Sequence, residues 1–153
     1  MDTILIAVDG SPASDVAARY GLELAAEHES RVTFALVVPA VDVVPAGGFG
    51  LTAALPHELS DSDRRPLDDA LAWAEDAGIH AHARLLRGDP VDELVAFADT
   101  IDADLIVVGS RGHGALACAR LGSVSRGILR EARRPVLVVR GAAARKETAT
   151  AAA

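Results

Sequence analysis

Short apolar stretches separated by helical patterns constrain this chain more than any other feature. Four runs of strand length are rich in Val, Ile and Leu and lack strict polar alternation. Strands that are buried on both faces of a parallel sheet have this pattern. The runs are Ile4–Val8, Val32–Val38, Leu105–Val108 and Pro135–Val139. A fifth, weaker run, Ile79–Leu86, alternates His80, His82 and Arg84 with apolar residues, which predicts a strand nearer an edge of the sheet.

Helical patterns fill the gaps between these runs. Ser11-Pro12 and Asp89-Pro90 each offer an N-cap residue followed by a first-turn proline. Two further helices are predicted, one from about Leu59 to Asp76 and one that starts at Ser123 and ends before Pro135. In the first helix the expected apolar stripe is Val16, Ala17, Tyr20 and Leu24. The order β-α-β-α-β-α-β-α-β predicts an α/β fold, a doubly wound five-stranded parallel sheet of order 3-2-1-4-5 with helices on both faces.

Two segments stand outside this alternation. The stretch Pro39–Glu58 contains three prolines and the sequence Gly47-Gly48-Phe49-Gly50. It is too long for an ordinary connection in a compact domain, so we expect either a lid or a mobile excursion. Residues 141–153 are rich in Ala and Thr and have no pattern, which predicts a disordered tail after a single domain spanning residues 1–140.

Charge and composition exclude several classes of function. The net charge of −7 argues against non-specific nucleic-acid binding. Residues 1–104 carry −14 and residues 105–153 carry +7, which favours a local anion site in the last third, although helix-end arginines alone would give the same count. Cys118 is the only cysteine, so no intrachain disulfide forms. No apolar run reaches membrane-spanning length, and we expect a cytoplasmic protein without a membrane partner.

The polar residues with binding chemistry follow the first and fourth strands. Asp9-Gly10-Ser11 follows the first strand, and a glycine-rich loop, Gly109-Ser110-Arg111-Gly112-His113-Gly114, follows the fourth. In open α/β sheets, ligands bind beyond the carboxyl ends of the strands where the strand order reverses. Gly122-Ser123 opens the last helix, whose N-terminal amides and dipole favour an anion. Glycines let backbone amides approach a phosphate closely, and Arg111 and Arg126 add positive charge.

These motifs resemble the ATP-binding branch of the universal stress protein family. The resemblance is carried by the spacing Gly109-x2-Gly112-x9-Gly122-Ser123, the opening ILIAVDGS over Ile4–Ser11, Gly88-Asp89-Pro90 and the closing strand Pro135–Val139. It covers Thr3 to Arg140. The chain departs from the family pattern at Arg111, which is often His, and at Gly114-Ala115, where a hydroxyl residue followed by Gly is common. Without that hydroxyl, contact with a phosphate depends more on backbone amides.

The resemblance implies an adenine nucleotide alpha hydrolase-like architecture, bound ATP with Mg²⁺, and a homodimer formed through Pro135–Val139. It places Asp9 on the ribose or adenine side, with Ala7 and Gly10 beside it, and Val37 near adenine. It implies that Val108 and Gly109 flank the nucleoside and that Gly112, His113 and Gly114 wrap the phosphates, with Arg111 beside them. It implies that Gly122, Ser123 and Val124 close the site from the other side.

The expected function is therefore ATP binding in a stress-response or regulatory protein. At most slow ATP hydrolysis is expected, because no positioned base is evident, and we assign neither catalytic residues nor a protein-bound metal. The alternative is a nucleotide-free homodimeric interaction module in which the glycines only shape a tight connection. A P-loop NTPase is excluded because Lys146 is the only lysine, and the dinucleotide fingerprint is absent after the first strand. His80 and His82 are interpreted as surface residues rather than the start of a metal site.

Overall fold

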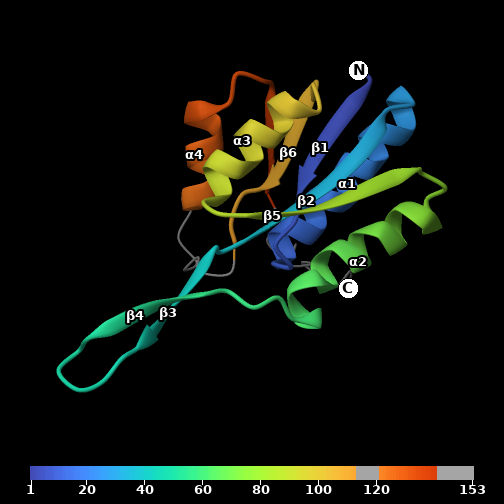
Figure 1. Cartoon of the computed structure of the whole chain (residues 1–153). Coiled ribbons are helices and arrows are strands. Elements are labelled where there is room, and N and C mark those ends of the chain that lie inside the picture. Colours follow the sequence, from blue (N-terminus) through green and yellow to red (C-terminus); the bar gives the residue numbers. More distant parts are fainter. Residues whose placement is uncertain (113–120, 141–153) are drawn as a thin grey trace, which may run out of the picture.

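A five-stranded parallel sheet forms the centre of the molecule (Figure 1). The computed structural model describes residues 1–112 and 121–140, so the predicted tail as well as His113, Gly114 and Cys118 lie outside the described residues. The strands of this sheet are β1 (Thr3–Ala7), β2 (Arg31–Val38), β5 (Ala81–Arg87), β6 (Leu105–Gly109) and β7 (Val136–Val139). Their order is β5-β2-β1-β6-β7. The predicted order 3-2-1-4-5 of the main strands is thereby confirmed.

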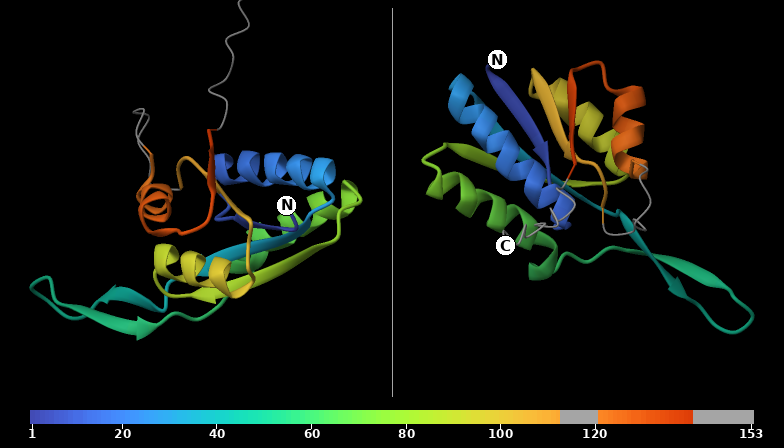
Figure 2. Two further views of the ribbon diagram at one scale, coloured as in Figure 1. Left: turned by 90° about the horizontal axis from the view of Figure 1, so that it is seen from above. Right: turned by 180° about the vertical axis from the view of Figure 1, so that it is seen from behind.

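Four helices cover the two faces of the sheet (Figure 2). They are α1 (Pro12–His28), α2 (Asp61–Asp76), α3 (Pro90–Thr100) and α4 (Ser123–Glu131). Buried residues fall into two clusters, one between the sheet and α1 with α2, the other between the sheet and α3 with α4. The first is centred on Ile4, Ile6 and Phe34, and the second on Leu5, Ile106 and Ile128. Successive residues of β1 thus point to opposite faces of the sheet. Because helices cover both faces, the residues on each face must be apolar.

The helices begin where the sequence predicts. Ser11 caps α1 by accepting a hydrogen bond from the amide of Ser14 at 3.3 Å. Asp89 caps α3 by accepting from the amides of Val91 and Asp92. Helix α2 begins two residues later than expected, at Asp61, after the N-cap Ser60. Within the described residues no helix is long and apolar enough to cross a membrane.

One prediction about α1 is wrong. Val16 and Tyr20, expected on its buried stripe, are 39% and 45% exposed. The buried side instead carries small residues such as Ala17, Ala18 and Gly21. A Cβ atom on Gly21 would stand 2.5 Å from Cδ1 of Ile6, so the helix packs too close to the sheet for a tyrosine to fit between them.

The segment Pro39–Glu58, for which the sequence predicted a lid or a mobile excursion, contains two strands that the sequence did not predict. Its strands β3 (Val41–Pro45) and β4 (Thr52–Pro56) form an antiparallel hairpin that projects from the body of the molecule (Figure 1). Pro45 and Pro56 stand at the last positions of β3 and β4, where they interrupt little of the ladder. The turn is closed by the amide of Ala46, which donates to the carbonyl of Leu51 at 2.9 Å.

Candidate functional site

The loop after β1 is a tight turn built around Asp9. The amide of Ser11 donates to Oδ1 of Asp9 at 2.9 Å, and the amide of Asp9 donates to the hydroxyl of Ser14 at 3.1 Å. Gly10 between them has φ 76°, a left-handed conformation that glycine adopts without strain. The turn places the carboxylate of Asp9 beside the start of α1.

The loop after β6 is held by contacts on both sides. The amide of Ser110 donates to the carbonyl of Val139 at 2.8 Å, which continues the pairing with β7. The hydroxyl of Ser125, from the first turn of α4, donates to the carbonyl of Gly109 at 2.6 Å. Gly109 also lies against α1, because a Cβ there would stand 2.7 Å from the backbone of Ala13. The loop therefore leaves the sheet in a defined direction.

The two loops meet, as the strand order requires. β1 and β6 are neighbours in the sheet, and the hydroxyl of Ser11 donates to the carbonyl of Arg111 at 3.3 Å. A Cβ on Gly112 would stand 2.7 Å from Oδ2 of Asp9, so the glycine backbone and the carboxylate are in close proximity. The structure thus brings together the first-strand and fourth-strand residues that the sequence analysis selected.

The N-terminus of α4 lies against the glycine loop, and the region bordered by Asp9, the Gly109–Gly112 loop and Gly122 is here called the crevice. Gly122 is its N-cap, and its amide donates to the carbonyl of Ser110 at 2.8 Å. A Cβ on Gly122 would lie 3.4 Å from Cα of Arg111, so the helix start directly faces the glycine loop. Among the described residues no side chain caps α4, in contrast to Ser11 at α1 and Asp89 at α3. A helix start without such a cap suits an anionic ligand.

Apolar members of the predicted site share one face of the sheet. Val108 is buried in the cluster beneath α3 and α4, and Ala7, Val37 and Val124 pack against the same cluster. They come from the ends of three strands and from α4, and they provide an apolar wall beside the polar loops. Such a combination of an apolar wall and a few polar groups is typical of small-molecule sites.

Two arginines of the predicted binding region lie within the described residues. Arg111 is half-buried in the loop, while Arg126 and the side chain of Ser123 are exposed on α4. Among the described residues, no group of three His, Cys, Asp or Glu side chains could hold a metal ion. The rings of His80 and His82 do stack edge to face, with centroids 5.4 Å apart, without a third ligand within that set.

The model of the universal stress protein family, Usp, matches residues 1–140. The chain belongs to this family. A universal stress protein of Methanocaldococcus jannaschii is 36% identical over 140 residues, covering 90% of this chain and 81% of that protein. A universal stress protein solved in complex with cAMP is 30% identical, with a TM-score of 0.67 and coverage of 90% and 96% of the two chains. One from Archaeoglobus fulgidus, solved in complex with dAMP, is 27% identical, with a TM-score of 0.58 and coverage of 91% and 97%. Structural relatives thus bind adenine nucleotides.

The sequence analysis missed the hydroxyl groups that assemble the crevice. Ser11 was selected as a helix cap, but its bond to Arg111 spans 100 residues and has no local signal. Ser14 and Ser125 were not selected at all. Ser125 lies three residues after Gly122, within the first turn of α4, where a buried serine is the one available hint of a polar partner.

Proposed function

We propose that this universal stress protein binds ATP in the crevice between Asp9, the Gly109–Gly112 loop and the start of α4. The observation that carries the proposal is the close approach of these segments, with the Cα of Gly112 against Asp9 and Gly122 against Arg111. Adenosine would lie toward the apolar wall and Asp9, and the phosphates toward the glycines and the amides of α4. The relatives bound to adenine nucleotides support the adenosine part.

The number of donors near Asp9 favours a triphosphate. The Gly109–Gly112 loop and the first turn of α4 supply amides, and Arg126 on α4 is exposed and adds positive charge. Mg²⁺ would arrive with the nucleotide and be held mainly by its phosphates. The described part of the loops offers amides and hydroxyls rather than a matched acid and base, so we expect slow turnover at most. We propose a nucleotide-dependent regulatory role in the cytoplasm, in which binding without efficient hydrolysis acts as a switch.

The test is calorimetric titration of nucleotide-free protein with AMP, cAMP, ADP and ATP, each with and without Mg²⁺. The affinity should rise with the number of phosphates. Gly112→Val places a side chain on Asp9, and Gly122→Val places one between α4 and the loop, so each should weaken ATP binding at least about tenfold. Gly48→Val is the matched control, since nothing lies within 4 Å of a Cβ there. Equal affinities for AMP and ATP would refute the phosphate assignment.

A homodimer through the last strand is the second part of the proposal. β7 is an edge strand of four apolar, half-buried residues. An apolar edge of this kind favours pairing with another copy. Next to it, α1 presents Tyr20 and Val16 to solvent. Arg19 of α1 stacks over Trp73 of α2 at 4.3 Å, so Tyr20, about 100° further round the helix, turns away from α2 and toward the β7 side.

A dimer is expected both for an ATP-binding protein and for the alternative, a nucleotide-free interaction module of the same fold, so the oligomeric state does not distinguish the two functions. The titration separates them, because the module would show no heat with any nucleotide and no nucleotide in the supernatant of denatured protein. In that outcome the glycines would serve only the tight packing between β6, α1 and α4.

A further inference from the structure

The β3–β4 hairpin presents an apolar surface that the other described residues do not cover. Residues 43–56 contain no ionisable side chain. Alternate residues of the two strands point to one side, here called the outer face, and every one of them is exposed. The outer face consists of Val41, Val43, Pro45, Thr52, Ala54 and Pro56. No hairpin residue belongs to either buried cluster.

The tip of the hairpin adds an aromatic side chain. Phe49 is fully exposed and has φ 66°, a left-handed conformation that is unfavourable for a bulky residue. The neighbouring Gly47 and Gly50 also have positive φ, so the turn requires this backbone. A two-stranded ribbon with an exposed aromatic tip is marginal in water by itself. Contact with another surface would supply the stabilisation that the isolated ribbon lacks.

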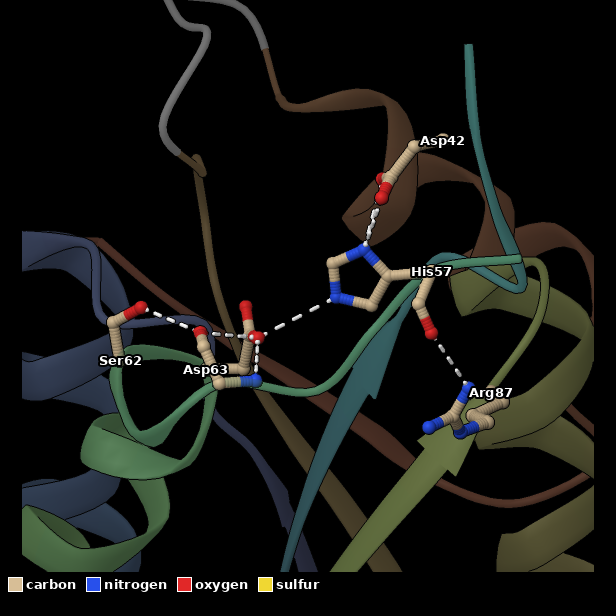
Figure 3. A network of polar contacts seen from close by, with 6 residues as sticks. Asp42, His57, Ser62, Asp63 and Arg87 are labelled. Carbon is tan, nitrogen blue, oxygen red and sulfur yellow. Dashed lines mark hydrogen bonds and ion pairs between the residues drawn. The ribbon is translucent and has the colours of Figure 1, made fainter. Parts of the chain in front are cut away.

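The base of the hairpin is held firmly, which distinguishes it from a loose loop. Nδ1 of His57 lies 2.8 Å from Oδ1 of Asp42 in β3, and its Nε2 lies 3.4 Å from Oδ2 of Asp63 in α2 (Figure 3). Arg87, at the end of β5, donates to the carbonyl of His57 at 3.1 Å. We call these four residues the His57 clasp. It connects the hairpin to α2 and to the sheet, so the hairpin projects in a fixed direction.

We propose that the outer face of the hairpin docks against the same face of a second copy of this chain. In a twofold contact each residue meets its counterpart, so any charged residue near the axis meets its own charge. For a protein of net charge −7 most surfaces are penalised in this way, whereas the outer face contains no charge. The prolines that end β3 and β4 remove edge donors, which favours face-to-face packing over strand addition.

The size of the outer face determines how strong this contact is. Two strands of five residues give a footprint on the order of 150–200 Å². That is well below the roughly 800 Å² per partner of a stable interface. A contact between hairpins alone is therefore weak and forms only at high protein concentration. It also forms between copies that another surface already holds together, because the local concentration of hairpins is then high.

A membrane surface fits the hairpin less well than a second copy. There is no Lys or Arg between residues 32 and 63, while Asp42, Glu58, Asp61 and Asp63 lie around the base. Anionic lipid headgroups would repel this base, and the basic residues that anchor proteins to such membranes are missing from the segment.

The test compares Val43→Asp, on the outer face, with Val44→Asp, its neighbour on the opposite face. Sedimentation velocity from about 10 µM to about 1 mM gives the mean mass of each protein. The wild type and Val44→Asp should reach about twice the mass of Val43→Asp at the highest concentration. The same comparison in a Tyr20→Glu background, which removes the apolar contact beside β7, separates the hairpin contact from the strand-edge dimer.

A second variant guards against disruption of the hairpin itself. The amide of His57 donates to the carbonyl of Ala40 at 3.1 Å, so residues 41–56 can be replaced by a two-residue turn. This variant should match Val43→Asp in mass and keep the helical circular dichroism of the wild type. Masses equal to the wild type in both variants would overturn the proposal. Hairpin-dependent flotation with phosphatidylcholine vesicles, without self-association, would also overturn it and assign the face to a lipid surface.

Discussion

Gly109 shows how a single missing side chain positions the crevice. A Cβ there would stand 2.7 Å from the carbonyl carbon and oxygen of Ala13 and 2.8 Å from the amide nitrogen of Ser14. These are backbone atoms at the start of α1, which cannot rotate away as a side-chain tip can. The glycine therefore serves packing between β6 and α1, whether or not a phosphate also approaches the loop after it.

We expect Gly109→Ala to lower the free energy of unfolding by about 1–3 kcal/mol, because α1 must shift to accommodate the methyl group. Urea denaturation followed by circular dichroism measures the change. Gly48→Ala is the control, since nothing lies within 4 Å of a Cβ at that position, and it should stay within about 0.5 kcal/mol of the wild type. Equal stability of the two variants would show that α1 is not held by this contact.

Much of the crevice could be predicted at the residue scale because its signals are local. Glycines after strand-like runs, and Ser11-Pro12 or Asp89-Pro90 before helical patterns, carry their meaning within a few positions. The His57 clasp could not be predicted in this way. Asp42 and Arg87 lie 15 and 30 residues from His57 along the chain, and nothing in the periodicity of the sequence connects them with His57 or with the nearer Asp63.

At the scale of elements, the β3–β4 hairpin was not predicted from the sequence. Strands are recognised by alternation or by continuous apolar runs of sufficient length. VDVVP and TAALP are short, end in proline and are apolar on both faces, so neither signal is strong. The register of the hairpin also depends on the turn and on the clasp at its base, which are properties of the folded chain.

The His57 clasp predicts how the hairpin responds to pH. The hydrogen bond with Asp42 raises the pKa of His57 above its ordinary value, with further support from Asp63, and burial opposes this only in part. The stabilisation is complete below the unfolded pKa of about 6.5 and is lost as the pH rises through the higher folded pKa. Neutral His57 has one ring N–H, so it cannot donate to both carboxylates. Arg87 contacts only the carbonyl of His57, so this bond does not involve the imidazole ring.

Hydrogen exchange of hairpin amides measures this loosening. After correction for intrinsic rates, protection of β3 and β4 should be constant below about pH 6.5 and fall as the pH rises through the raised pKa of His57. His57→Gln should have lower protection at pH 6 and little change with pH, whereas His80→Gln, outside the clasp, should behave as the wild type does. A pH profile that survives in His57→Gln would assign the effect to another group.

For the whole molecule, the exposed residues of α1 and the edge strand β7 predict the mode of assembly. Tyr20→Glu places a carboxylate beside the apolar β7 edge of each copy, so the proposed dimer should dissociate at least about tenfold more readily. Light scattering after gel filtration at micromolar concentration measures the mass. Tyr20 is 45% exposed, so the fold itself should be unaffected. Glu23→Ala, on the same helix, is the control, and a wild-type monomer would contradict the dimer.

The topology of the whole molecule could be predicted because few arrangements satisfy alternating strands and helices with right-handed crossovers. The sequence was less informative about the surface. Val16 and Tyr20 have the spacing of core residues, and only the close approach of Gly21 to Ile6 turns them outward. Apolar residues that the fold leaves exposed look the same in sequence as those that it buries.

The central position of β1 has a consequence for the order in which the protein forms during synthesis. β1, β2 and β5 follow one another along the chain and can pair as they leave the ribosome. The other edge of β1 stays unpaired until β6 has been synthesised. The same delay applies to the hydrogen bond from the amide of Asp2 to the carboxylate of Asp104, 2.6 Å long, which joins residues 102 positions apart. At about 5–20 residues per second this delay lasts several seconds. The segments around the crevice thus come together only late in synthesis, and the proposed nucleotide would stabilise only a late step of folding.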